Sequence, residues 1–411
     1  MAGLVILAAC QPVFEVQISL ETEAAEPVLG KVAYIMGGDL WVYDLDNAQD
    51  QRLTFEGYAS HPRWSPDGSK IAYRKQNQLW VVNLASQQHD LVREFRVDWF
   101  TWSASSDQML YFSQEEGLTL WDGATQTPAL VLPDVSGIAL NDFVYDDQNG
   151  VLLFTKGQVE QGVSAVALVQ FDLVQMETSN LFKSLDLKLV PLMAELSPGG
   201  QWASFWQWDT RVMFYEEEGL PLCYLPVSGG EVQCTTAMAV PSLGFLDWSS
   251  DGQLVYLTVD GDLIMADPLK GSEELLVELK DRLPINPTWA PDGGRIAISV
   301  MDQDAGDAEE GRDLSEGIIP RRIGVVDLAS QKLNLLTGDA EFGDELPQWS
   351  SDGKYILFAR QNEERMSLWL MRANGRDQVE IVPELTPKPR PVGQQSDVSW
   401  SKWWDWWRPE L

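Results

Sequence analysis

Short segments in which apolar and polar residues alternate recur along the chain, separated by turns rich in Gly, Asp, Asn and Pro. The best-formed unit is HPRWSPDGSKIAYRKQNQLWVVNL at 61–84, in which a first segment ends at Trp64 and the turn SPDG follows. Alternating segments then begin at Ile71 and Leu79. Such alternation is typical of strands with one buried face, and no segment shows a sustained helical period. The pattern therefore predicts a chain of short β-strands.

The unit returns along the sequence, each time with a first strand that ends in Trp or in a residue that replaces it. These motif residues are Trp64, Trp102, Tyr145, Leu196, Trp248, Trp289 and Trp349. A fourth, more polar strand ends each unit, as QRLT does at 51–54. Four short antiparallel strands in a repeating unit predict a propeller blade.

An eighth unit is divided between the two ends of the chain. Residues 31–54 supply its second, third and fourth strands, and SDVSWSKWW, which contains Trp400, supplies only a first strand. We therefore predict an all-β fold, a β-propeller of four-stranded antiparallel blades. The motif count gives eight blades, with seven or six as alternatives, and the ring is closed by pairing of the N-terminal strands with the C-terminal strand.

The C-terminal tryptophans fit a closing strand. Alternation places Trp400, Trp404 and Trp406 on one face of that strand and Trp403 and Trp407 on the other, so both faces would pack against neighbouring blades. The alternative is an aromatic platform that binds carbohydrate or lipid.

The WSPDG units resemble the propeller repeats of the TolB family and of WD-type proteins, over roughly residues 31–404. The non-catalytic propellers of prolyl-oligopeptidase-type peptidases have related units. The resemblance to TolB implies a protein of the bacterial cell envelope that binds other envelope components. This chain lacks an obvious α/β domain ahead of its repeats, and it counts more blades than TolB has.

The N-terminal residues MAGLVILAAC resemble the end of a lipoprotein signal peptide, in which Cys10 would be lipidated. Because no Lys or Arg precedes Cys10, we expect the true start to lie upstream, the alternative being a chance apolar N-terminus. The sequence thus predicts a partial signal peptide at 1–10, a tether at 11–30 and a propeller at 31–411. It also predicts an extracytoplasmic, lipid-anchored location in the cell envelope.

The charge balance limits the partners. The chain has 62 acidic and 29 basic residues, a formal net charge of −33. Since this field repels phosphate, nucleic acid is excluded as a partner. We expect a monomer that binds an envelope protein or a small basic or sugar-like ligand.

Residues suited to catalysis are sparse. The two histidines, His61 and His89, fall on opposite faces of the predicted propeller, and the sequence contains no G-x-S-x-G motif. We therefore predict a non-enzymatic binding scaffold. The alternative is a carbohydrate-active or peptidase-related enzyme that uses the central funnel.

No cofactor is predicted, although one acidic segment has the oxygen ligands that Ca²⁺ prefers, at Asp302, Asp304 and Asp307. The alternative is a solvated acidic insertion. In CYLPVSGGEVQC, a turn at Ser228-Gly229 would place Cys223 directly opposite Cys234. A Cα separation of about 5.5 Å would then allow a disulfide, the alternative being two free thiols.

A ligand is expected at the mouth of the funnel, where the first strands begin. The residues three positions before the motif residues, together with their acidic neighbours, mark that rim, although each of them also suits ordinary packing. The candidates are His61, Asp98, Trp99, Phe245, Asn286, Asp344, Glu345, Leu346 and Asp397.

Overall fold

A computed structural model describes residues 28–409 apart from several gaps. The gaps are 104–106, 126, 133–142, 147–148, 161–162, 186–188, 212–217, 280–281, 283, 302–319, 339–340, 363 and 387–401. Several predictions concern residues outside the described ranges, namely those for the segment 1–10 with Cys10, most of the tether, Asp302, Asp304, Asp307, Asp397 and Trp400. No helix among the described residues has the length and apolarity needed to cross a membrane.

The described residues form six antiparallel sheets of four strands and one sheet of eight strands. The first sheet has the order β3 (Gln49–Arg52), β2 (Asp39–Asp44), β1 (Lys31–Met36) and β32 (Trp404–Trp407). The second contains β4 (Ala59–Trp64), β5 (Lys70–Lys75), β6 (Gln78–Asn83) and β7 (His89–Arg93). The third contains β8 (Trp99–Trp102), β9 (Gln108–Ser113), β10 (Gly117–Asp122) and β11 (Thr127–Leu132).

The next three sheets repeat this order. The fourth contains β12 (Val144–Asp146), β13 (Val151–Glu160), β14 (Val163–Asp172) and β15 (Glu177–Leu185). The fifth contains β16 (Leu189–Leu196), β17 (Trp202–Asp209), β18 (Leu220–Pro226) and β19 (Gln233–Ala239). A 3-10 helix, η1 (Leu243–Phe245), precedes the sixth, which contains β20 (Leu246–Trp248), β21 (Leu254–Leu257), β22 (Asp262–Asp267) and β23 (Ser272–Glu278).

The eight-stranded sheet consists of two antiparallel groups of four. One contains β24 (Ile285–Trp289), β25 (Arg295–Met301), β26 (Arg321–Asp327) and β27 (Lys332–Leu335). The other contains β28 (Gly343–Trp349), β29 (Tyr355–Gln361), β30 (Met366–Arg372) and β31 (Val379–Val382). A single parallel pair, Arg321 opposite Gly343, joins the two groups.

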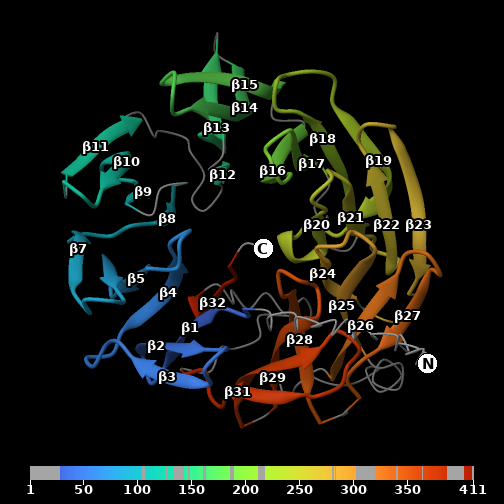
Figure 1. Ribbon diagram of the computed structural model, residues 1–411. Helices are drawn as coiled ribbons and strands as arrows, with labels where there is room; N and C mark the ends of the chain where they lie inside the picture. Colours follow the sequence, from blue (N-terminus) through green and yellow to red (C-terminus); the bar gives the residue numbers. More distant parts are fainter. Residues whose placement is uncertain are drawn as a thin grey trace, which may run out of the picture.

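The sheets are arranged around a common centre: β4, β8 and β16 lie nearer the centre than β7, β11 and β19, and in the first sheet β32 lies nearer the centre than β3 (Figure 1). The hydrophobic core lies between neighbouring sheets. One cluster, for example, joins Ile35 and Val42 of the first sheet to Trp64 and Ile71 of the second. Each sheet therefore depends on its neighbours to bury both faces.

The motif turn has the predicted chemistry. The first strand of the second sheet ends at Trp64, and the Gly68 N–H donates to the Ser65 carbonyl at 2.9 Å. Gly68 has a φ of +68°, a conformation in which a side chain is strained. The Asp67 carboxylate accepts hydrogen bonds from the backbone and the hydroxyl of Ser69, which fixes the turn.

The motif tryptophans link one sheet to the next through the indole N–H. Trp102 donates to the carbonyl of Arg63 at 3.0 Å. Arg63 directly precedes Trp64, the motif residue of the preceding sheet. The same bond joins Trp289 to Asp247 at 3.2 Å and Trp349 to Thr288 at 3.1 Å. Burial of the indole body and satisfaction of its N–H explain why Trp recurs at this position.

The same bond also joins the two ends of the chain. Trp64 donates its indole N–H to the carbonyl of Asp405 at 3.1 Å, and its backbone N–H to the Asp405 carboxylate at 2.9 Å. Asp247 accepts the same two bonds from Trp289. Asp405 therefore corresponds to Asp247, and Trp406 to a motif tryptophan. The sequence had given that role to Trp400.

The C-terminal strand β32 pairs antiparallel with β1, with Lys31 opposite Trp407 and Tyr34 opposite Trp404. Trp404 and Trp406 are buried in a hydrophobic cluster that they share with β29, β30 and β31. Trp407 packs instead against the cluster shared with the second sheet. The predicted alternation of these three residues is confirmed, and both faces of β32 are covered.

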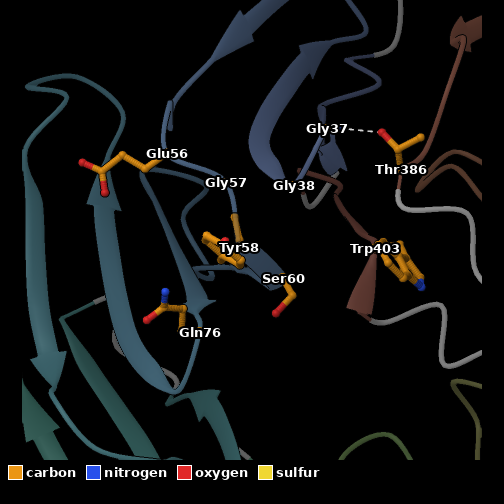
Figure 2. Close-up of a pocket in the computed structure, with 10 residues that line it drawn as sticks. Gly37, Gly38, Glu56, Gly57, Tyr58, Ser60, Gln76, Thr386 and Trp403 are labelled. Carbon is orange, nitrogen blue, oxygen red and sulfur yellow. Dashed lines mark hydrogen bonds between the residues drawn. The ribbon is translucent and has the colours of Figure 1, made fainter.

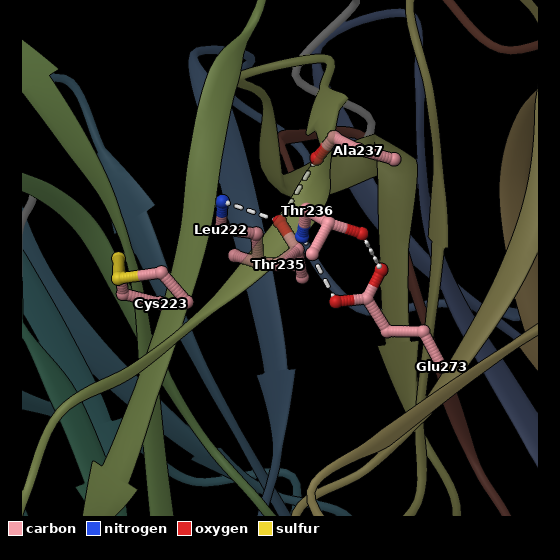
Figure 3. Close-up of a disulfide and its surroundings, with 7 residues drawn as sticks. Leu222, Cys223, Thr235, Thr236, Ala237 and Glu273 are labelled. Atoms are coloured by element: carbon pink, nitrogen blue, oxygen red, sulfur yellow. Dashed lines mark hydrogen bonds between the residues drawn. A yellow bond between two sulfur atoms is a disulfide. The ribbon is translucent and has the colours of Figure 1, made fainter.

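The predicted disulfide between Cys223 and Cys234 is present (Figure 3). The two residues lie directly opposite each other on β18 and β19, in the predicted register, with Cα atoms 3.9 Å apart, closer than expected. Beside the disulfide, Glu273 of β23 accepts from the backbone N–H and the hydroxyl of Thr236, at 2.9 and 3.0 Å. The hairpin is therefore held both internally and by the next sheet.

A matched pair of substitutions tests the packing of the C-terminal strand. A Cβ at Gly68 would lie 2.3 Å from the Trp407 ring, whereas a Cβ at Gly293, in the equivalent turn with a φ of +66°, would meet nothing. We expect Gly293→Ala to cost about 1–2 kcal/mol from the backbone alone. Gly68→Ala should cost at least about 1 kcal/mol more in denaturant unfolding, because Trp407 must move. Equal losses would show that Trp407 does not pack on this turn.

Candidate functional site

A β-bulge recurs in the first strands of several sheets, three residues before the motif position. His61, Met193, Asn286 and Leu346 all have φ between +49° and +54°, and each lies three residues before a motif position. At each of them the strand register shifts by one residue against its neighbour. Such bulges redirect side chains, and non-Gly residues in this conformation are uncommon. The recurring bulge therefore sets which residues face the rim.

One cavity lies against the inner strands of the second, third and fourth sheets. Its volume is about 510 Å³. We call it the inner-strand cavity, and its lining is His61, Arg63, Arg74, Asp98, Trp99, Phe100, Thr101, Phe143, Val144, Tyr145 and Lys402. Three of the predicted rim residues, His61, Asp98 and Trp99, meet here. The size is within the usual range for small-molecule sites.

Positive charge dominates the polar part of this cavity. Burial, and to a lesser extent the nearby charges of Arg74, Arg63 and Lys402, lower the pKa of His61 to about 3. His61 is therefore neutral at physiological pH, with its Nδ1 3.1 Å from the Ser60 hydroxyl. Burial also lowers the pKa of both arginines.

The aromatic wall and the acidic residue of the cavity are held by neighbouring groups. The Trp99 and Phe143 rings have centroids 5.2 Å apart, and Arg74 lies 5.6 Å from the Phe100 ring centroid. The Asp98 carboxylate accepts from the Arg96 Nε at 2.7 Å and from the Gln114 backbone N–H at 3.1 Å. These contacts fix the side chains before any ligand arrives.

Two of the predicted rim residues are buried within their own sheet. Asp344 is 1% exposed, and its carboxylate forms two hydrogen bonds with Arg360 at 2.6 and 2.9 Å. Glu345 is 2% exposed and lies 3.3 Å from the Nε of Arg321. Their positions favour a structural role over contact with a ligand, because each carboxylate is already matched by a buried cation.

Phe245 and Asn286 occupy a different part of the rim. Phe245 ends η1 and packs on the core cluster between the sixth sheet and β24–β26. Asn286, in β24, is near Gly244 of η1, and its Oδ1 is buried with no hydrogen-bond partner among the described residues. Neither residue lines the inner-strand cavity, so the predicted rim residues do not form one site.

A second cavity, of about 730 Å³, lies where the chain ends meet, and we call it the seam cavity. Figure 2 shows Tyr58, Ser60 and Gln76 on one side, with Thr386 and Trp403 on the other. Gly37 donates its backbone N–H to the Thr386 hydroxyl. Tyr58 is 68% exposed with a φ of +68°. Sequence reasoning did not find this cavity, because its residues come from three separate turns and the C-terminal segment.

The histidines do not form a joint site. His61 is in β4 and His89 begins β7, which are the two edge strands of the second sheet. His89 is 2.9 Å from the Tyr73 hydroxyl. Among the described residues, no three His, Cys, Asp or Glu side chains are grouped so that they could hold a metal ion.

In the fifth and sixth sheets, acidic residues occupy the position directly before the motif residue, which Arg63 occupies in the second sheet. Glu195 and Asp247 each precede a motif residue and keep some solvent-accessible surface, although protein surrounds them closely. Burial, and to a lesser extent the charge of Asp247, raise the pKa of Glu195 to about 8. Burial likewise raises the pKa of Asp247 to about 6, against hydrogen bonds from the Trp289 and Trp248 backbone.

Sequence reasoning missed the cations of the inner-strand cavity. Arg63 directly precedes the motif residue Trp64, so the repeat itself marked that position as inner-facing. Arg74 lies on β5, opposite Ser60 of β4, and Lys402 comes from the C-terminal segment. Only the fold brings these three residues together.

The pH dependence of stability tests the environment of Glu195. Because its pKa is raised in the folded state, the folded protein keeps a proton that the unfolded chain releases between about pH 4.5 and pH 8. This group therefore makes the protein less stable as pH rises through that window. We expect Glu195→Gln to gain more than about 1 kcal/mol relative to the wild type between about pH 5 and pH 8.

The measurement is the free energy of unfolding in denaturant at several pH values. Glu231→Gln, a change of the same kind at an exposed turn residue, is the control and should show no such trend. A constant difference between Glu195→Gln and the wild type across the window would contradict the assignment.

Comparison with family models and known proteins places the fold. Residues 31–94 match the model of the dipeptidyl peptidase IV (DPP IV) N-terminal region, which is a propeller domain. No curated protein matches the chain. The match covers β1 to β7, less than half of the sequence.

Solved structures match over most of the chain at low identity. Dihydro-heme d1 dehydrogenase NirN has a TM-score of 0.58 at 13% identity, covering 88% of this chain and 75% of that one. Oligogalacturonate lyase from Vibrio parahaemolyticus has a TM-score of 0.52 at 14% identity, covering 83% and 97%. A putative TolB from Agrobacterium tumefaciens matches at 14% identity, covering 86% and 87%, with a TM-score of 0.38. The chain is therefore similar in fold to solved β-propeller proteins.

Proposed function

We propose that this protein is a non-enzymatic binding scaffold, a propeller that holds a protein or a small ligand at the inner-strand cavity. The observation that carries the proposal is the cavity itself. Its aromatic and cationic side chains come from the inner strands β4 and β8, from β5 and β12, and from Lys402. Rigid strands position such a site more precisely than loops do.

The chemistry of the cavity supports binding over catalysis. A histidine with a pKa of about 3 is a weak general base at neutral pH, and His61 is the histidine of this cavity. The alternative is a carbohydrate-active or peptidase-related enzyme. Neighbours such as the oligogalacturonate lyase and a puromycin hydrolase support that alternative at the level of fold alone.

The propeller is proposed to have eight blades and to be closed by β32. Six four-stranded sheets and the two groups of the eight-stranded sheet give eight units. The pairing of β1 with β32 and the bond from Trp64 to Asp405 support closure between the first and last units. Closure would remove two exposed sheet edges, which are prone to aggregation.

The proposed location is the extracytoplasmic side of a bacterial envelope, with a lipid anchor at Cys10. The disulfide between Cys223 and Cys234 supports an oxidising compartment. The sequence of residues 1–10 supports the anchor. The proposed partner is an envelope protein or a small ligand, bound by a monomer.

Site-specific photo-crosslinking in envelope fractions tests the scaffold function. A crosslinker placed at Lys402 should capture a discrete partner if that partner occupies the inner-strand cavity. The control position is Leu269, which is 78% exposed in the turn between β22 and β23. Equal capture at both positions, or none at Lys402, would contradict binding of a macromolecular partner at the cavity.

A panel of glycan and peptide substrates tests the enzyme alternative. We expect no turnover above that of a heat-inactivated sample. Turnover that is reproducible and lost in Trp99→Ala, a change in the cavity wall, would establish the enzyme instead. Unchanged melting of Trp99→Ala is required, so that loss of folding is not mistaken for loss of a site.

A further inference from the structure

The inner-strand cavity is cationic within a protein that is strongly anionic. The formal net charge of the chain is −33, yet Arg63, Arg74 and Lys402 line this cavity. Among the described lining residues, Asp98 is the one carboxylate set against them. Because the protein as a whole repels anions, concentrated positive charge in a concave site indicates a local requirement for it.

The acidic residue of the cavity is committed elsewhere. The Asp98 side chain is 7% exposed, and its two oxygens accept from Arg96 Nε and from the backbone N–H of Gln114. Arg74 reaches the main chain of Asp98, donating to its carbonyl oxygen at 2.6 Å. Asp98 therefore neutralises Arg96 directly and Arg74 only at longer range.

The three cations have different surroundings. The Arg74 Nε is buried and has no hydrogen-bond partner among the described residues. Arg63 donates to the carbonyl of Pro62 at 2.7 Å, while the carboxylate of Asp405 lies near enough to favour its charged form. Lys402 is exposed at the cavity edge. The Arg74 guanidinium lines the cavity and donates there to a neutral carbonyl oxygen, so an anionic ligand in the cavity would balance its charge.

The remaining walls suit a ligand with a flat face. Trp99 and Tyr145 line the same cavity, and aromatic rings commonly stack against sugar rings or other flat groups. The neutral imidazole of His61 offers one donor and one acceptor to hydroxyl groups. A volume of about 510 Å³ holds a sugar of one or two rings.

We propose that the inner-strand cavity binds a small anionic sugar, with its carboxylate or phosphate held by Arg74, Lys402 and Arg63. The inference rests on the binding function proposed above and names the ligand class. It keeps the sugar-like ligand expected from the sequence and replaces the expected basic ligand by an acidic one. Guanidinium groups suit both carboxylate and phosphate, so the anion is the shared chemistry.

Four sugars that share one ring test the charge preference. The probes are glucuronate, glucose 6-phosphate, glucose and glucosamine, each titrated calorimetrically up to about 10 mM at low salt. We expect at least one of the two anionic sugars to bind at least about tenfold more tightly than glucose and glucosamine. The anion that binds more tightly distinguishes a carboxylate from a phosphate ligand. Equal or tighter binding of glucosamine would overturn the proposal, as would no heat from either anion.

Charge-removing variants test the location. We expect Arg74→Gln and Lys402→Gln each to weaken binding of the anionic sugar by about tenfold or more. The control is Arg376→Gln, which removes the same charge from an exposed turn between β30 and β31 and should bind as the wild type does. Lys402 is exposed, so its variant keeps the fold even if Arg74→Gln does not. Unchanged affinity in Lys402→Gln and in a folded Arg74→Gln would overturn the assignment.

The two proposals fail in different ways. If neither anionic sugar binds while a crosslinker at Lys402 still captures a partner, the ligand class is wrong and the scaffold function stands. If anionic sugars are bound and then chemically converted, the ligand class stands and the scaffold function is wrong.

Discussion

The pairing of β32 with β1 joins the two ends of the chain, and the rest of the structure depends on it. Trp404 lies opposite Tyr34, and Trp407 opposite Lys31. On one side Trp406 is buried against the last strands of the chain, while on the other Trp64 donates to Asp405. This contact repeats the bond that links other neighbouring sheets, so the junction between the chain ends uses the same chemistry as the repeats do.

Both cavities are built where the ends meet. Lys402 lines the inner-strand cavity and Trp403 lines the seam cavity, and these two residues directly precede β32. In β4, at its bulge, Ser60 lines the seam cavity and the next residue, His61, lines the inner-strand cavity. The pairing that places β32 therefore also positions the residues that we propose to bind a ligand. Stability and the proposed binding would therefore both depend on this segment.

The repeats could be predicted from sequence because their signals are local. The turn after Trp64 requires Gly68 at positive φ, and the spacing of Cys223 and Cys234 follows from hairpin register. The charge of the site could not be predicted in the same way. Arg63, Arg74 and Lys402 converge from β4, β5 and the C-terminal segment.

The residues predicted for the rim do not lie together in the structure, for two physical reasons. The bulge at His61 shifts the register of β4, so counting back from Trp64 does not by itself say where a side chain points. The second reason is pairing across strands, which buries Asp344 against Arg360 and Glu345 beside Arg321. A carboxylate near a strand start looks exposed in sequence until its partner is known.

The most direct test is a chain that stops after Lys402 and so lacks β32. Burial of each tryptophan contributes about 2–3 kcal/mol, against a typical net stability of about 5–15 kcal/mol. Loss of Trp404 and Trp406 together with the hydrogen bonds of β1 should abolish cooperative folding. The account predicts an aggregated or unfolded product by size-exclusion chromatography and far-UV circular dichroism. A monomer with an unchanged melting temperature and spectrum would contradict it.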